Sequence, residues 1–437
     1  MIKKITILLV LSPLLFAVSL PELIHIGLEK STVIRKSRAD IDAAREKRKE
    51  SRADQLGSID LVGGYTHFNL PRTLAPLTPV TMKNPVTAAN VATTKDLFST
   101  GVRYSVPLFT GFAQTRQIEM DDIATQISQG KLSLSREQLV YNIASLYLSA
   151  LAFEEMYQAQ RLYVKALQKL DDTIAKEVRL GKKAPIDMLK SQAQLQSNLS
   201  YLEVLKSDIA ITKASLASLV GIDRIGSIEG FRVIVREPHE NIDRFMEDAS
   251  RLERVHISTL SLKKADRVIK KSEAGYYPQI SLDSYYGYNY GQNDPSNPNS
   301  GEWADEKSWQ VGVSAKWTLF DFGKRDAAGQ KARIAQLQAK LDKKQTILDL
   351  KRSLIEAKEK LKQAYADYQG NLKQLKLADE SEKIEKVRYL NGISTINDLL
   401  YAKSQSHLAS AKLIESKYNY QKGKFYLDYL LERGVKK

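Results

Sequence analysis

The residue types that catalyse reactions or bind metals are present in this chain, but their spacing does not build such a site. Cysteine is absent, which excludes disulfides and thiolate metal ligands. The sequence has no P-loop, no G-x-G-x-x-G motif and no nucleophile elbow. The five histidines are scattered without ligand spacing: His25, His67, His239, His256 and His407. We therefore predict no enzymatic activity, no cofactor and no bound metal.

Two aspartates share a local sequence context in which a carboxylate could cap a helix or attract cations. Asp187 follows Gly181, and Asp398 follows Gly392, in the common spacing Gly-x5-Asp-x-Leu. Glycine adopts the positive φ that ends many helices, and an aspartate at the start of the next helix accepts backbone N–H bonds. Helix capping therefore explains both aspartates locally. An additional role in attracting cations is an alternative that the spacing leaves open.

These two turns belong to an internal repeat with a constant offset of 211 positions. The same offset relates a second set of residues, in which Gly101, Val102, Leu108 and Phe109 recur as Gly312, Val313, Leu319 and Phe320. One offset for both sets indicates a duplication. We predict a first repeat over 20–241 and a second over 242–437. Each contains a helix, two strands, a long helix, a turn and another helix, followed by a linker or a tail.

Residues 1–19 have the pattern of a secretory signal peptide. Lys3 and Lys4 precede an apolar run that ends at Ala17, and Ala17-Val18-Ser19 is a small-x-small cleavage site. The run is shorter than the roughly 20 residues of a membrane-spanning helix. No later run approaches its length. We predict an exported chain that is either soluble or crosses a membrane as a β-barrel.

Net charge is +15, and the lysines and arginines are spread along predicted helices. A basic balance is typical of nucleic-acid-binding proteins. The predicted export argues against that function, and solvated faces of a charge-rich coiled coil account for the pattern. We therefore predict no nucleic-acid partner.

Two stretches without proline, 112–180 and 324–390, predict very long helices. At a rise of 1.5 Å per residue, each spans on the order of 100 Å, which suits coiled-coil walls that reach across a distance. Shorter helices are predicted at 21–55, 187–219 and 242–275, with a linker at 220–241 that contains a strand-like piece at 231–235. The second long stretch has a heptad seam of apolar residues: Ile347, Leu350, Leu354, Leu361, Tyr365, Tyr368, Leu372 and Leu375.

Four strands are predicted, at 59–69, 97–108, 280–290 and 307–319, with loops at 70–96 and 291–306. The last strand alternates two faces, with Lys316 and Thr318 at the end of the polar face. The apolar face contains Trp309, Val311, Val313, Ala315, Trp317 and Leu319. Arg103 lies on the polar face of the matching strand. Two interpretations remain open: an antiparallel sheet packed on a helix, or part of a transmembrane barrel. Four strands cannot close a barrel, since the smallest have about eight, so the second interpretation requires an oligomer.

With its elements in this order, the chain resembles the outer membrane efflux proteins, the TolC-like channel-tunnels, over nearly its whole mature length. The opening segment 20–45, the strand-to-helix junctions 107–111 and 318–323, and the two Gly-x5-Asp-x-Leu turns carry the resemblance. Two copies of each junction and turn, in order and behind a signal peptide, make the match specific.

The resemblance implies a mixed α and β fold, in which a long α-helical coiled-coil barrel continues a transmembrane β-barrel with four strands per chain and 12 in a trimer. It implies a homotrimer in contact with outer membrane lipid that extends into the periplasm. The implied partners are a periplasmic adaptor (membrane fusion) protein and an inner membrane transporter. The implied function is the exit duct of a tripartite efflux or type I secretion system, which conducts substrates passively.

The resemblance also assigns residues to the periplasmic entrance. Asp187 and Asp398 match tip positions, and Asp398 matches a ring at the tunnel mouth that favours cations. Tyr389 keeps an aromatic residue of the constriction. Tyr401 stands where a second acidic ring would fall, and Ser394 where an arginine helps to hold the entrance shut. We therefore expect one acidic ring and different latching contacts.

Gly181 and Gly392 would mark the adaptor-docking tips, and Arg103 and Lys316 would line the barrel lumen. The repeats differ at two matched positions, with Pro107 against Thr318 and Lys183 against Ser394. The alternative to a duct is a periplasmic coiled-coil scaffold or adaptor without a pore. The alternation over 309–319 favours the duct, because an adaptor needs no lipid-facing strand.

Overall fold

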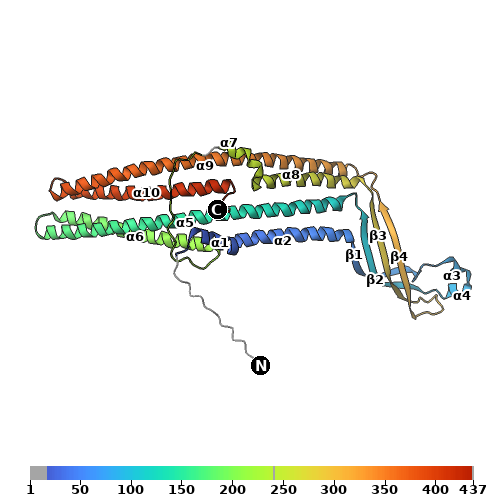
Figure 1. The fold of residues 1–437 in the computed structure, drawn as a ribbon. Coiled ribbons are helices and arrows are strands. Elements are labelled where there is room, and N and C mark those ends of the chain that lie inside the picture. The colour runs from blue at the N-terminus through green and yellow to red at the C-terminus, as the bar shows by residue number, and fades with distance from the viewer. Residues whose placement is uncertain (1–16, 240–241, 436–437) are drawn as a thin grey trace, which may run out of the picture. The chain divides into compact units, whose positions relative to one another are not determined.

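The computed structural model describes residues 17–239 and 242–435 (Figure 1). Most of the predicted signal peptide, residues 1–16, lies outside the described residues. The four strands are β1 (Ser58–Thr73), β2 (Thr93–Phe109), β3 (Gln279–Gln292) and β4 (Trp303–Lys316). The helices are α1 (Leu20–Lys30), α2 (Thr32–Ala53), α3 (Pro79–Lys83), α4 (Pro85–Ala89), α5 (Ala113–Arg179), α6 (Pro185–Val220), α7 (Ile242–Glu247), α8 (Glu253–Ser272), α9 (Lys324–Leu390) and α10 (Ile396–Leu430).

The prediction of two very long helices is confirmed. Both α5 and α9 contain 67 residues, and α9 has the predicted bounds. Its heptad seam is buried at Leu350, Leu354 and Leu361, which pack with Leu427 of α10. The predicted strands are also present, and each is extended by a few residues at one or both ends, except that β4 stops at Lys316. Among the described residues, no helix has the length and apolar character needed to cross a membrane.

Two predicted helices are interrupted. The helix expected at 21–55 breaks at Ser31, whose buried backbone adopts an extended ψ of 131°. The helix expected at 242–275 breaks at Leu252, after which α8 begins. The carboxylate of Glu432 accepts the backbone N–H groups of Glu253 and Arg254 at 2.5 and 3.3 Å. A carboxylate at a helix start is stabilising, and this one comes from the distant end of the chain.

The strand-like piece expected at 231–235 is wrong. This linker between α6 and α7 has no strand there, and Ile228 instead forms an isolated bridge with Val18. Farther along, the Tyr420 hydroxyl donates to the carbonyl of Arg236 at 2.7 Å. A side chain thus pairs a backbone carbonyl just after this segment. The last strand also ends earlier than expected, because Arg325 binds the carbonyls of Thr318 and Leu319.

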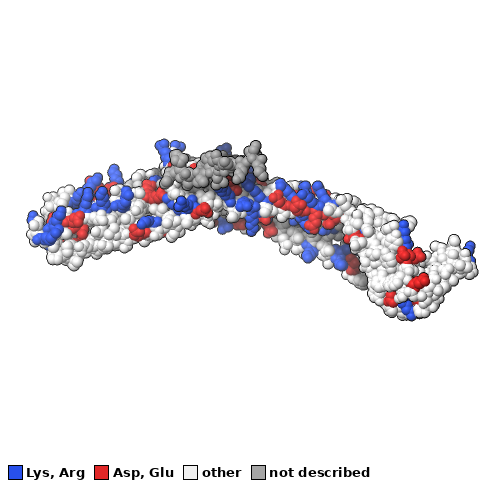
Figure 2. Space-filling view, turned by 90° about the horizontal axis from the view of Figure 1, so that it is seen from below, with Lys and Arg blue, Asp and Glu red and all other residues white. Residues whose placement is uncertain are grey.

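The chain divides into two compact units, each with parts of both repeats. The helical unit contains the described part of Met1–Asp40, with Gln129–Ile257 and Lys344–Lys437. The sheet unit contains Ile41–Ser128 and Ser258–Lys343. Acidic and basic side chains are interspersed over the helices (Figure 2), as expected for solvated coiled-coil faces.

The sheet unit contains one antiparallel sheet in the order β1-β2-β3-β4. Cross-strand neighbours share a face, and the register places Val102 opposite Tyr286 and Tyr286 opposite Trp309. The predicted apolar face is therefore continuous across strands from both repeats. The predicted membership of Trp317 and Leu319 in that face is wrong, since both follow the end of β4.

Candidate functional site

The two predicted tips have the same backbone geometry. Gly181 and Gly392 have φ values of 69° and 72°, as expected for glycine after a helix end. In both tips, the N–H after the glycine donates to the carbonyl five residues earlier, and the glycine N–H donates to the carbonyl three residues earlier: Lys182 to Glu177, Gly181 to Val178, Ile393 to Arg388 and Gly392 to Tyr389. This is the Schellman pattern, and it reverses the chain between α5 and α6 and between α9 and α10.

Asp398 takes part in a capping box at the start of α10. Thr395 is the N-cap, and its hydroxyl accepts the Asp398 N–H at 3.3 Å. The Asp398 carboxylate in turn accepts the Thr395 N–H at 3.0 Å and the Thr395 hydroxyl at 2.7 Å. These bonds to the charged form hold the pKa of Asp398 below its ordinary value. The side chain is exposed, so one carboxylate both caps the helix and presents negative charge to solvent.

Asp187 is placed differently despite its matched position. Helix α6 begins at Pro185 after Ala184, and no side chain caps it. The carboxylate is half-buried rather than exposed. Its charge, after burial and the charge of Glu177, contributes to a raised pKa at Tyr389. The two aspartates therefore share a backbone position but have different electrostatic surroundings.

Tyr389 lies where the two hairpins meet. It is 6% exposed and packs with Ile174 of α5 and Ile396 of α10. The Lys183 ammonium, in the turn of the other hairpin, lies 4.4 Å from the centroid of its ring. At this distance the cation is attracted to the face of the aromatic ring. Sequence reasoning singled out Lys183 only as a difference between the repeats, because its aromatic partner lies in the other repeat.

The other two predicted entrance residues make no bridge between the hairpins within the described chain. The Ser394 hydroxyl is buried and has no hydrogen-bond partner among the described residues. The Tyr401 side chain is 68% exposed. The cation–π contact of Lys183 with Tyr389 does join the two hairpins near their tips.

Arg103 and Lys316 both lie on the polar face of the sheet. Arg103 stands opposite Asp60 on β1 and Tyr285 on β3, and Lys316 stands opposite Gln279 at the end of β4. The same face carries a chain of hydroxyl and carboxylate contacts, in which Ser105 donates to Asp283 at 2.7 Å and Ser281 lies 2.8 Å from Ser314. A face of this composition is suited to water.

The opposite face of the sheet is apolar and uncovered in the single chain. Leu61 is 83% exposed, Trp309 68% and Val311 64%. Large apolar side chains that are exposed together mark a surface that meets another apolar phase. The sheet thus has one polar face and one exposed apolar face.

The described residues contain no group of three or more His, Cys, Asp or Glu that could hold a metal ion. His407 instead stacks on Tyr163 with ring centroids 4.3 Å apart. Burial lowers the pKa of His407, which keeps the ring neutral and suited to packing.

A sheet with one apolar and one polar face, followed by two long helical hairpins with matching tips, defines a class of proteins: outer membrane channels with an α-helical extension. The chain belongs to the outer membrane efflux protein family, whose model matches residues 23–222 and 256–431. It is an exit duct for efflux, located in the outer membrane and extending into the periplasm. The family is one of transport channels rather than enzymes.

Relatives and solved structures agree with this assignment. The outer membrane protein TolC of Vibrio cholerae is 20% identical over 418 residues, which cover 94% of this chain and 90% of the relative. The Campylobacter jejuni CmeC outer membrane channel has a TM-score of 0.77 at 15% identity, covering 95% of this chain and 86% of CmeC. The open state of the Neisseria gonorrhoeae MtrE outer membrane channel has a TM-score of 0.73 at 16% identity, covering 95% and 89%. At these identities the structural likeness establishes the fold.

Proposed function

We propose that three copies of this chain form one closed duct, with the strands as a 12-stranded barrel and the helices as a tunnel. The observation that carries this proposal is the sheet itself. Its apolar face is exposed, and β1 and β4 are edge strands with no outer neighbour in the described chain. In lipid, backbone groups must be hydrogen-bonded within the protein. Pairing β4 of one copy with β1 of the next satisfies both edges and exceeds the smallest barrel of about eight strands.

Membrane fractionation with heat-modifiable migration tests the trimer. We expect the protein in outer membranes, migrating as a trimer before heating and as a monomer after it. Conductance in planar bilayers should accompany the trimer. A soluble periplasmic monomer would contradict the proposal.

We further propose that the tips dock a periplasmic adaptor, which connects the duct to an inner membrane transporter in a tripartite efflux or type I secretion system. Exposed apolar side chains flank both turns: Leu180 at 69% and Ile186 at 51% in the first hairpin, and Leu390 at 70% and Ile393 at 67% in the second. Such side chains favour contact with another protein. Gly181 and Gly392 shape this docking surface through their positive φ.

A bulky residue at Gly392 should impair transport more than assembly. No atom lies within 4 Å of the position a Cβ would take, so strain from the positive φ dominates. That strain is about 1–2 kcal/mol, enough to lower the equilibrium constant for the native turn about tenfold. Transport should fall by about the same factor. Gly392→Val is compared with Gly370→Val, within α9, where φ is not positive and space is equally open. The readouts are efflux in cells and trimer in membranes; loss of the trimer in Gly392→Val would contradict the prediction.

We also propose that Asp398 gives the periplasmic entrance its cation preference, in a region that includes Asp187, Tyr389, Ser394 and Tyr401. Three copies would bring three exposed carboxylates to one opening. A ring of carboxylates attracts cations electrostatically.

Asp398→Asn should lower the cation-to-anion permeability ratio about threefold, because it removes the ring charge and keeps an oxygen that can cap the helix. Asp398→Ala should have the same effect on the ratio. Thr395→Ala removes the capping partner and leaves the charge, so its ratio should stay at the wild-type value. Reversal potentials in a salt gradient give the ratio. Equal changes in Asp398→Asn and Thr395→Ala would assign the effect to the helix end rather than to charge, against the proposal.

A further inference from the structure

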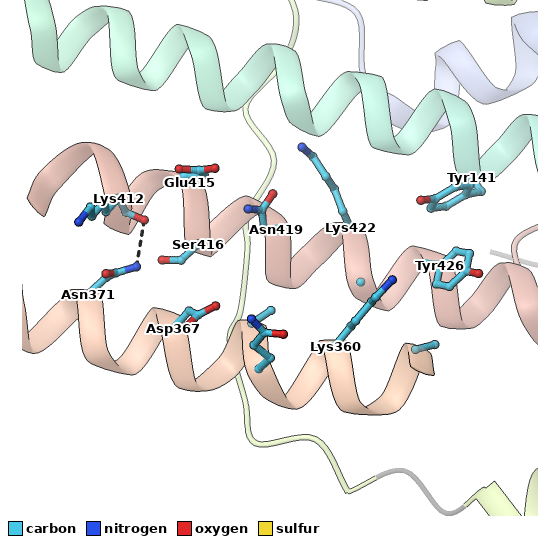
Figure 3. A pocket seen from close by; sticks show the side chains of 14 residues that line it. Tyr141, Lys360, Asp367, Asn371, Lys412, Glu415, Ser416, Asn419, Lys422 and Tyr426 are labelled. Atoms are coloured by element: carbon cyan, nitrogen blue, oxygen red, sulfur yellow. Dashed lines mark hydrogen bonds between the residues drawn. The ribbon is translucent and has the colours of Figure 1, made fainter. Parts of the chain in front are cut away.

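A polar pocket of about 630 Å³ lies between α9 and α10 in the helical unit, with Tyr141 of α5 at one end (Figure 3). Three lysines line it, Lys360 from α9 and Lys412 and Lys422 from α10. The lining also includes two carboxylates and several neutral polar groups: Asp367, Glu415, Gln363, Asn371, Ser416 and Asn419. No residue of this pocket belongs to the tips or to the sheet.

The lysines of the pocket lack the ion pairs that nearby lysines make. On α10, Lys417 lies 2.6 Å from Glu155 and Lys403 lies 2.6 Å from Glu382. Lys360, Lys412 and Lys422 form no such pair with the described residues. A charged group withdrawn from water without a partner is unfavourable. Of the three, Lys422 is half-buried, whereas Lys360 and Lys412 are exposed. The cost of burial without a partner therefore applies to Lys422, and the other two lysines add solvated positive charge beside it.

Lys422 is the lysine for which a bound anion would matter most. Its side chain is half-buried and points from α10 toward α5 (Figure 3). Burial lowers its pKa, and the charge of Glu415 only partly opposes that effect. A bound anion would restore the charged form, since a nearby opposite charge favours ionisation.

Aromatic surface adjoins the positive groups. The rings of Tyr141 and Tyr426 lie 5.4 Å apart, and Figure 3 places both at the end of the pocket that holds Lys360 and Lys422. Burial is the main cause that raises the pKa of Tyr141, so its hydroxyl stays protonated and can donate. Two rings beside two ammonium groups fit a ligand with a flat apolar body and an anionic group.

The two sides of α10 identify which face of the helices this pocket occupies. Residues advance by about 100° around a helix, so Asn419 and Tyr426 in the pocket lie opposite Gln421 and Asp428. The side of Gln421 and Asp428 is covered by α1 and by Phe231 of the linker, which enclose a separate cavity. In the proposed duct the helices form the wall of the tunnel. Segments that lie across these helices, such as α1 and the linker, must be on the outer surface of that wall, because on the inner surface they would block the passage. The polar pocket is therefore on the passage side.

We infer that the pocket between α9 and α10 binds organic anions with an aromatic body as they move through the duct, and that such anions are among its cargo. This inference rests on the proposed duct. It concerns a level of the tunnel away from the acidic tips, so a cation preference at Asp398 and anion binding here are separate properties. The positive charge is supplied by Lys360 and Lys422.

The test uses the full-length trimer in planar bilayers and in detergent, with naphthalene-2-sulfonate as the probe and the neutral naphthalene-2-sulfonamide as its matched control. The sulfonate should reduce single-channel current, and the sulfonamide should not. In the double variant Lys360→Gln/Lys422→Gln, half-block should need about tenfold more sulfonate, since charge-assisted contacts are lost. Calorimetric binding in detergent should weaken by the same factor. Lys424→Gln, on the opposite side of α10, should behave as wild type.

Lys360→Arg keeps the charge and should retain block, which separates loss of charge from damage to the helix. Equal block in the double variant and the wild type would overturn the inference, as would equal block by the sulfonamide. Calorimetric binding without any block would contradict the passage-side location. If the trimer conducts and its block by the sulfonate does not depend on these lysines, only the inference is refuted. If the chain never conducts, the proposed duct is refuted.

Discussion

Val311→Lys should strongly reduce assembly in the outer membrane, while Gln310→Lys, one position away, should be tolerated. Val311 lies near the middle of β4 on the apolar face and is 64% exposed in the single chain. A lysine on the lipid face near the bilayer midplane costs roughly 2–4 kcal/mol. Gln310 points to the other face, opposite Tyr285, where water would solvate the new charge.

The measurement is the free energy of unfolding in liposomes from urea titration, together with the amount of heat-modifiable trimer in outer membranes. Val311→Thr keeps the β-branched shape without a charge and separates polarity from strand propensity. Val311→Lys should have a much lower free energy of unfolding and much less trimer than Gln310→Lys and Val311→Thr. Equal losses for Val311→Lys and Gln310→Lys would mean that the two faces are not in different environments, and would contradict the barrel.

Lys183→Gln should open the periplasmic entrance more often than in the wild type. The Lys183 ammonium lies 4.4 Å from the centroid of the Tyr389 ring, and this contact joins the two hairpins. Replacing the lysine removes the contact. A cation–π contact of about 0.5–2 kcal/mol corresponds to as much as a thirtyfold change in the open-to-closed ratio. Tyr389→Leu should have a similar effect, since it removes the ring and keeps an apolar side chain.

Tyr389→Phe distinguishes the ring from the hydroxyl. The Tyr389 hydroxyl is buried without a hydrogen-bond partner among the described residues, so its removal should leave the closed state as stable or slightly more stable. Lys182→Gln, beside Lys183 in the same turn, controls for general loss of positive charge. Single-channel open probability is the readout. Two results would disprove a role of the Lys183–Tyr389 contact in closing the entrance. One is an equal open probability in Tyr389→Phe and Tyr389→Leu, and the other is an equal open probability in Lys182→Gln and Lys183→Gln.

Elements with a strong local period were predictable from the sequence. The two 67-residue helices follow from proline-free stretches with apolar seams. The strands follow from alternation, and the turn at Gly392 follows from the need for positive φ. The break at Leu252 could not be read in this way, because the start of α8 is capped by a distant group, the Glu432 carboxylate. The break at Ser31 has no local sequence signal either.

The sequence alone determined the duplication, because one constant offset relates both sets of matched residues. It also determined the two-faced strands and the paired tips, because these depend on spacing within a few turns or strands. Only the tertiary structure decided which residues meet across the repeats. It placed Lys183 on Tyr389, gave Asp398 a capping box that Asp187 lacks, and gathered the lysines of α9 and α10 around one pocket. Local periodicity specifies the face on which a residue lies. The partner across that face depends on how whole helices align, which no local pattern encodes.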